Sequence, residues 1–150
     1  MSWLREREAM GFSTQPVLIH NDFHPQNTLL REGSLVIIDW SFAEVGDFRM
    51  DLAWSILLFN VMAGGDHRVA LKKAYERAAD SHIENFGFFE ALKFTMRMVT
   101  IGTWLDEAVM IPVAGITKHA IRTDYKIHIM NPYRRLKEIT GLEIATIEEL

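Results

Sequence analysis

The chain has 150 residues, 49% of them hydrophobic, and a formal net charge of −4. This length suits one domain with its own core, and the hydrophobic fraction is too high for a disordered chain. The absence of cysteine excludes disulfides, thiolate metal sites and a cysteine nucleophile, and the absence of a basic stripe argues against a nucleic-acid partner.

The N-terminal third of the chain predicts a strand, a polar loop and a hairpin. Residues 17–20 are mostly branched and apolar, as in a strand, and residues 21–26 are polar, as in a loop. The apolar segments 28–30 and 35–38 flank residues 31–34 (REGS), a sequence typical of a hairpin turn. Polar residues therefore gather on the loop and at the end of the second hairpin strand.

The rest of the chain is helical in pattern. Helices are predicted over residues 2–10, 48–62, 66–79, 88–106, 116–130 and 131–140. Asp47 is expected to cap the second of these, and Pro132 to occupy the first turn of the last. The most apolar stretch, 52–62, is too short to span a bilayer, and the first residues carry no signal core. We expect a single α+β, mostly helical domain over residues 1–150, cytoplasmic and without a membrane partner.

The spacing of three polar residues predicts the chemistry. Asp22 is followed by Asn27 five residues later, and Asp39 ends the second hairpin strand. Kinases use this spacing to hold a substrate hydroxyl and the magnesium of ATP. Asp22 would be the catalytic base or orienting group, and Asn27 and Asp39 would offer the hard oxygen ligands that Mg²⁺ prefers. Taken singly, each of the three is more typical of a turn or a cap; taken together, they favour the kinase interpretation.

Two histidines allow another interpretation. His20, Asp22 and His24 could bind zinc or iron for hydrolysis, but no third ligand cluster with metal spacing follows. We favour a scaffold role for His20, which would hold the loop or the strand that carries Asp39. His24 is a candidate for substrate or phosphate contact, and an exposed loop histidine is the alternative.

Asp47 and Asp51 form a second acidic pair. Both suit the positive end of a helix dipole, where they would cap the helix. Asp51 could also reach back and brace the catalytic loop, and we favour a structural role over catalysis for both residues.

Residues 17–27 (VLIHNDFHPQN) resemble the catalytic loop of the aminoglycoside phosphotransferase and choline kinase superfamily. Residues 37–41 (IIDWS) and 46–53 (GDFRMDLA) resemble its continuation in the aminoglycoside phosphotransferase branch, in the family's order and spacing. The resemblance implies the C-terminal lobe of a protein-kinase-like fold. It also implies Mg²⁺, ATP or GTP as phosphate donor, and a small hydroxylated acceptor such as an aminoglycoside, choline or a sugar.

Two positions depart from the family's pattern. Asn21 stands where the aminoglycoside branch usually has glycine and choline kinases more often have asparagine, and Phe48 stands where proline is common. Only eleven residues separate Asp39 from Asp51, too few for a long regulated loop that docks a peptide, which favours a small-molecule substrate.

The nucleotide-binding half of a kinase is not visible in the sequence. None of the nine glycines forms Gly-x-Gly-x-x-Gly or a P-loop, and no Val-Ala-Ile-Lys-like strand is present. We therefore expect a C-terminal lobe without its N-terminal lobe, inactive or weakly active alone, which could self-associate through the uncovered face. The alternative is a non-catalytic remnant that binds a small molecule or a partner; a metal-dependent hydrolase is the less favoured choice.

Overall fold

The computed structural model describes residues 2–7, 11–12, 15–63, 66–105, 117–123 and 126–149. The chain divides into two compact units, Met1–Glu90 and Ala91–Leu150, which are taken here one at a time. The described part is mostly helical, with two small antiparallel strand pairs, and the α+β prediction is confirmed at this level. Parts of the predicted helices lie outside the described residues, namely 8–10, 106, 116 and 124–125.

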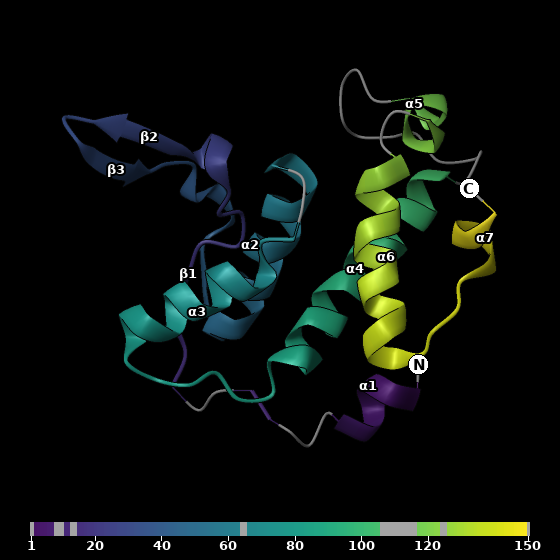
Figure 1. Cartoon of the computed structure of the whole chain (residues 1–150), viewed down its shortest axis with the longest axis horizontal. Helices are drawn as coiled ribbons and strands as arrows, with labels where there is room; N and C mark the ends of the chain where they lie inside the picture. Colours follow the sequence, from purple (N-terminus) through teal and green to yellow (C-terminus); the bar gives the residue numbers. More distant parts are fainter. Residues whose placement is uncertain are drawn as a thin grey trace. The chain divides into compact units, whose positions relative to one another are not determined.

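Two strand pairs frame the polar loop of the first unit (Figure 1). Strand β1 (Val17–Ile19) pairs with β4 (Glu44–Gly46), and β2 (Thr28–Arg31) pairs with β3 (Ser34–Ile37), both antiparallel. The predicted strand and hairpin are therefore present, whereas β4 was not predicted.

The pairing of β1 with β4 depends on a close approach at Gly46. A Cβ atom at this position would lie 2.8 Å from Cδ1 of Ile19, whose side chain is buried. Any larger residue would therefore require the side chain of Ile19 to shift.

The hairpin closes through a two-residue turn. Glu32 and Gly33 both have positive φ, 51° and 79°, which is the backbone of a type I′ turn. This turn sets the register, with Leu30 opposite Leu35 and Thr28 opposite Ile37. The turn of the hairpin points away from α2 (Phe48–Ala63) and α3 (Arg68–Ala79) (Figure 1).

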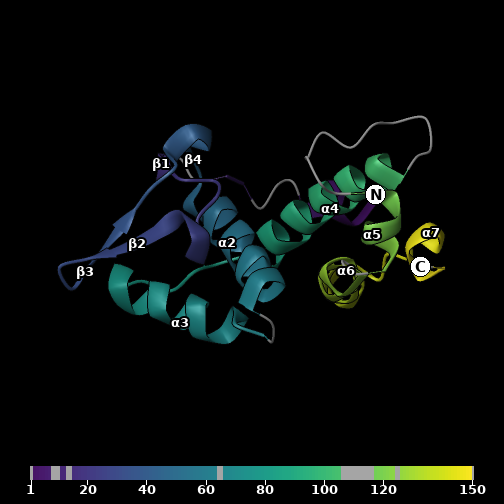
Figure 2. The same cartoon turned by 90° about the horizontal axis from the view of Figure 1, so that it is seen from above.

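Helix α2 forms the core of the first unit. Its buried side chains lie on several sides, and the fully buried ones include Ala53, Ile56 and Leu57. Burial of each of the two larger side chains stabilises the fold by roughly 1.5–3 kcal/mol. Helix α3 lies beside α2 in both views (Figure 1, Figure 2), and the rings of Phe48 and Tyr75 stack with 5.3 Å between their centroids. A short helix, α1 (Ser2–Arg7), precedes β1.

The helices of the C-terminal part differ from the prediction in two respects. They are α4 (Phe86–Leu105), α5 (Lys118–Arg122), α6 (Lys126–Thr140) and α7 (Ala145–Glu148), of which the first turn of α4 belongs to the first unit. The predicted helix 116–130 is wrong, because α5 ends at Arg122. The placement of Pro132 in a first turn is also wrong, because it lies inside α6.

The packing of α6 explains why the helix continues through proline. Ile129, Tyr133 and Leu136 are buried with helical spacing on both sides of Pro132. A proline inside a helix costs roughly 3 kcal/mol, and burial of a continuous apolar stripe offsets this cost. In the described part of the chain, no helix combines the length and apolar character needed to cross a bilayer.

Candidate functional site

The loop between β1 and β2 is held in place by a carboxylate from helix α2. Asp51 accepts hydrogen bonds from two successive backbone N–H groups, those of His20 at 2.9 Å and Asn21 at 2.8 Å, one on each carboxylate oxygen. Hydrogen bonds to an ionised acceptor are stronger than those between neutral groups. The start of the loop is therefore fixed to the first turn of α2.

The ring of His20 connects the loop to the end of the hairpin. Its Nδ1 accepts a hydrogen bond from the backbone N–H of Asp22 at 3.2 Å, and its Nε2 lies 2.9 Å from the carbonyl oxygen of Ile38. The ring hydrogen is therefore on Nε2, where it donates to that carbonyl. His20 is buried, and both ring nitrogens are used within the protein.

Asp22 and Asn27 are joined directly. The side-chain Nδ2 of Asn27 donates to the carboxylate Oδ2 of Asp22 at 3.0 Å and to its backbone carbonyl at 2.9 Å. Nε2 of His24 lies 3.5 Å from the same Oδ2. Among the described residues no donor lies within hydrogen-bonding distance of Oδ1 of Asp22. One oxygen of this carboxylate is thus held by the protein, and the side chain as a whole is 26% exposed.

His24 also stabilises the local backbone. It precedes a short 3-10 helix, η2 (Pro25–Asn27), and its Nδ1 accepts the backbone N–H of Gln26 at 3.2 Å. The side chain is buried, so the alternative of an exposed loop histidine is wrong. His24 holds both the start of η2 and the carboxylate of Asp22.

Asp39 is exposed and has a left-handed backbone, with φ 58° and ψ 64°. It precedes the short 3-10 helix η3 (Trp40–Phe42). The hydroxyl of Ser41 donates to Oδ1 of Asp39 at 2.5 Å. The side chain and backbone of Ser41 both hydrogen-bond to this carboxylate and lower its pKa below the usual value. Asp39 therefore stays ionised at neutral pH.

The backbone places Asn27 and Asp39 at the same end of the hairpin. The N–H of Ile38 donates to the carbonyl of Asn27 at 2.9 Å, which continues the β2–β3 ladder by one step. Because Nδ2 of Asn27 is turned towards Asp22, its amide oxygen is available to another group. An amide oxygen and an ionised carboxylate form a donor set that suits Mg²⁺.

A buried ion pair that sequence reasoning did not single out lies next to the site. Nε and Nη2 of Arg49 donate to the carboxylate of Asp47 at 2.9 and 2.6 Å, and the backbone N–H of Arg49 donates to Oδ1 at 3.0 Å. Arg49 also donates to the carbonyls of Gly11 and Glu84, and its guanidinium lies 4.0 Å from the ring centre of Phe89. Asp47 thus holds Arg49 as well as the first turn of α2. The Asp-x-Arg spacing at the helix start was the available signal.

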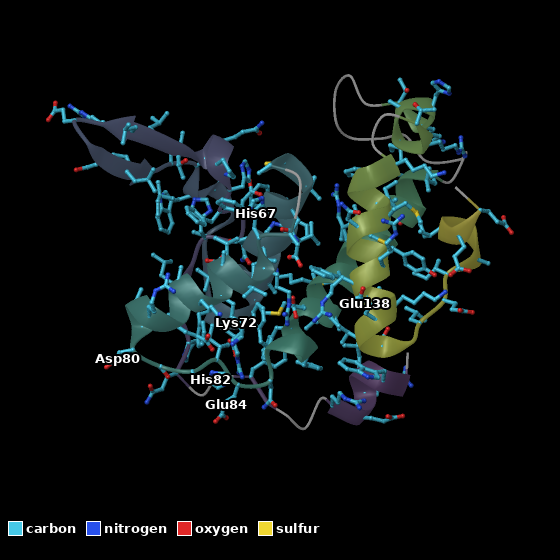
Figure 3. The ribbon with its side chains drawn as sticks, viewed as in Figure 1. His67, Lys72, Asp80, His82, Glu84 and Glu138 are labelled. Carbon is cyan, nitrogen blue, oxygen red and sulfur yellow. The ribbon has the colours of Figure 1, made fainter. Side chains whose placement is uncertain are left out.

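The geometry does not favour the transition-metal interpretation. His20 cannot ligate a metal with either ring nitrogen while it makes the hydrogen bonds described above. Within the described residues, no group of three or more His, Cys, Asp or Glu side chains is arranged to hold a metal ion. His67 precedes α3 and His82 follows it, so these two histidines lie at opposite ends of the helix (Figure 3).

The backbone at Asn21 accounts for the residue found there. Its φ of 61° is left-handed, a conformation that glycine and asparagine adopt more readily than other residues. Nδ2 of Asn21 also donates to Glu44 at 2.7 Å and to the carbonyl of Phe42 at 3.3 Å, so the loop is tied to β4.

We expect the free energy of unfolding of Asn21→Ala to be about 1 kcal/mol lower than that of Asn21→Gly, because alanine is strained in a left-handed backbone conformation. Both variants lose the same side-chain hydrogen bonds, so each is the control for the other. Urea titrations followed by far-UV circular dichroism measure the difference. Equal stability of the two variants would show that the strain at position 21 is negligible.

Comparison with known families agrees with this geometry. Residues 1–89 match the profile of the phosphotransferase enzyme family, APH. The matched segment coincides almost completely with the first compact unit, which holds Asp22, Asn27, Asp39 and their supporting residues. Among curated proteins, none matches the chain. The family match covers more than half of the 150 residues and includes the whole candidate site, so the chain belongs to the phosphotransferase enzyme family.

Proposed function

We propose that the chain carries the catalytic residues of a kinase that transfers the γ-phosphate of ATP or GTP to a hydroxyl group of a small molecule. The observation that carries this proposal is the direct hydrogen bond between Asp22 and Asn27, with Asn27 beside Asp39 at the end of the hairpin. The acceptor would be an aminoglycoside, choline, a sugar or a related compound. Such a reaction fits the cytoplasm, where nucleotide and Mg²⁺ are present.

Each site residue has a task in this reaction. The other oxygen of Asp22 accepts a hydrogen bond from the attacking hydroxyl. It takes up the hydroxyl proton as the bond from the hydroxyl oxygen to the γ-phosphorus forms and the bond from the γ-phosphorus to the β,γ-bridging oxygen breaks, which releases ADP or GDP. Asn27 and Asp39 would hold Mg²⁺, which neutralises charge on the phosphates when it is bound. The amide of Asn27 also fixes the carboxylate of Asp22, so one side chain positions both the base and the metal ligand.

The supporting residues keep this arrangement rigid. Asp51 holds the start of the loop, His20 joins the loop to the carbonyl of Ile38, and His24 contacts Asp22. Phosphoryl transfer depends on positioning and on electrostatic stabilisation, so such a framework contributes directly to the rate. A direct contact of His24 with substrate is not part of this proposal, because the ring is buried and its nitrogens face the protein.

The proposal also assigns a fold. Residues 1–150 would form a C-terminal lobe of the protein-kinase-like fold, and efficient transfer would need a nucleotide-binding lobe in addition. Support for this comes from the sequence, in which no glycine-rich phosphate loop accompanies the catalytic motif.

The test is a search for labelled product after incubation of the chain with Mg²⁺ and γ-labelled ATP or GTP. The acceptors would be aminoglycosides, choline, homoserine and sugars. We expect slow transfer to one class, far below the roughly 1–100 per second of ordinary kinases. Chelation of Mg²⁺ should stop the transfer, and added Mg²⁺ should restore it. A well-folded sample at high concentration that binds an acceptor but neither phosphorylates it nor binds Mg²⁺ with nucleotide would contradict the proposal and favour a binding module.

We expect the chain to self-associate through its two strand pairs, β1–β4 and β2–β3. Several apolar side chains on them are more than half exposed: Leu18, Leu30, Leu35 and Val45. Exposed apolar patches of this kind mark contact surfaces. Light scattering should show a mass above 17.3 kDa that falls when Leu30 is replaced by glutamate. A monomer at high concentration would contradict this expectation.

A further inference from the structure

A hollow lies next to the catalytic loop, and His20 and Phe23 of this loop line it. It has a volume of about 350 Å³ and is bounded by β1, the end of β3 and helices α2 and α3. Asp22, Asn27 and Asp39 do not line it, whereas His20 and Asp51, which support the catalytic loop, do. All its walls belong to the first compact unit.

Aromatic rings make up much of the wall. The four rings are those of Phe23, Trp40, Phe48 and Tyr75. Two of them, Phe48 and Tyr75, are stacked on each other with an interplanar angle of 5°. Apolar cavities with a few polar groups are typical of small-molecule sites, and aromatic faces attract cations.

The wall of the hollow includes one acidic side chain. Asp51 supplies a carboxylate to the wall, and no lysine or arginine is found among the described residues that line it. Burial, together with the charges of Asp51 and Asp47, raises the pKa of the Tyr75 hydroxyl. A carboxylate without a lysine or arginine beside it in the wall favours a positively charged occupant over a neutral or anionic one.

We propose that this hollow binds a small organic ammonium ion that carries an aromatic ring. The ring would pack against the aromatic wall, and the ammonium group would face the carboxylate of Asp51. This binding does not require the proposed phosphoryl transfer, since Asp22, Asn27 and Asp39 do not line the hollow.

A ligand in the hollow would affect the catalytic loop through one residue, Asp51. Asp51 lines the hollow and also accepts the backbone N–H groups of His20 and Asn21. A cation beside this carboxylate competes with both hydrogen bonds, so the two amides report on binding. Any effect on the rate of transfer rests on the proposed function, whereas the binding itself does not.

The experiment is an NMR titration of the nitrogen-15-labelled chain with three compounds that share one ring and differ in charge. They are 2-phenylethylamine, 2-phenylethanol and phenylacetate. The reporters are the amides of His20 and Asn21 and the indole N–H of Trp40, which donates to the carbonyl of Ile37 at 3.1 Å. We expect saturable shifts, with the amine bound about tenfold or more tightly than phenylacetate. Equal binding of the three compounds, or tightest binding of phenylacetate, would overturn the proposal.

A matched pair of variants locates the site. Ala74 lines the hollow on α3, so Ala74→Phe should fill it and abolish the shifts. Ala70→Phe makes the same change one turn earlier on the same helix, at a position that does not line the hollow, and should leave the shifts intact. Far-UV circular dichroism checks that both variants fold. Shifts that survive in Ala74→Phe would place the ligand elsewhere and refute the assignment. No nucleotide is present in the titration, so its result is separate from that of the transfer assay.

Discussion

Replacing Asp22 by asparagine is expected to slow phosphoryl transfer about 10²–10⁴-fold, the usual contribution of general base catalysis. Asparagine has the same shape, and its oxygen can still accept the hydrogen bond from Nδ2 of Asn27. It cannot take up the proton of the attacking hydroxyl, and it lacks the charge that orients that hydroxyl. The loss therefore measures the carboxylate itself. Single-turnover transfer from γ-labelled ATP at high protein concentration makes slow rates accessible.

A control variant for this prediction is Asp80→Asn. Asp80 lies just after α3 in a left-handed conformation that asparagine also adopts readily, so the same chemical change is made away from the site. This variant should transfer phosphate at the wild-type rate. If Asp22→Asn also retained the wild-type rate, Asp22 would not be the base.

Replacing Arg49 by methionine should lower the free energy of unfolding by about 3–5 kcal/mol, because it leaves the carboxylate of Asp47 buried without its cation. Both partners are largely buried, at 9% and 6% exposure. The same substitution removes the hydrogen bonds to the carbonyls of Gly11 and Glu84 and the contact with Phe89. Urea titration followed by far-UV circular dichroism provides the measurement.

The comparison for this prediction is Arg77→Met, an exposed arginine on α3. Surface substitutions of this kind usually change stability by less than about 0.5 kcal/mol. The double variant Asp47→Leu with Arg49→Met removes both charges and should recover part of the loss, since a buried pair can often be replaced by apolar residues. A loss below about 1 kcal/mol for Arg49→Met alone would show that the pair is not important for stability.

The sequence allowed the loop and the hairpin to be predicted because both carry strong local signals. Alternating polar and apolar segments and the Glu32-Gly33 turn define the hairpin, and Asp22, Asn27 and Asp39 have a spacing that single turns rarely produce. Strand β4 was missed because Glu44, Val45 and Gly46 have no strand pattern of their own. They become a strand by pairing with β1, where the small size of Gly46 lets Ile19 come close.

Long-range packing explains the features of the structure that were predicted wrongly or not predicted. Pro132 is a strong local signal for a helix start, but the buried stripe on α6 outweighs it. Arg49 was not singled out because its partners include carbonyls 35 and 38 residues away, which no local pattern can indicate. The interactions of His20 with Asp22 and Ile38 likewise depend on how the loop folds back on the hairpin.

The hydrogen bonds between Asp51 and the loop limit how the site can be transferred to another protein. The carboxylate that fixes His20 comes from a helix 31 residues further along the chain, so residues 20–27 do not form a portable unit. Grafting this segment onto another scaffold would transplant the reactive side chains without the helix that orients them. A functional transplant would need to include the chain from β1 through the first turns of α2. Conversely, replacement of Asp51 should change the rate of transfer without touching any reactive group.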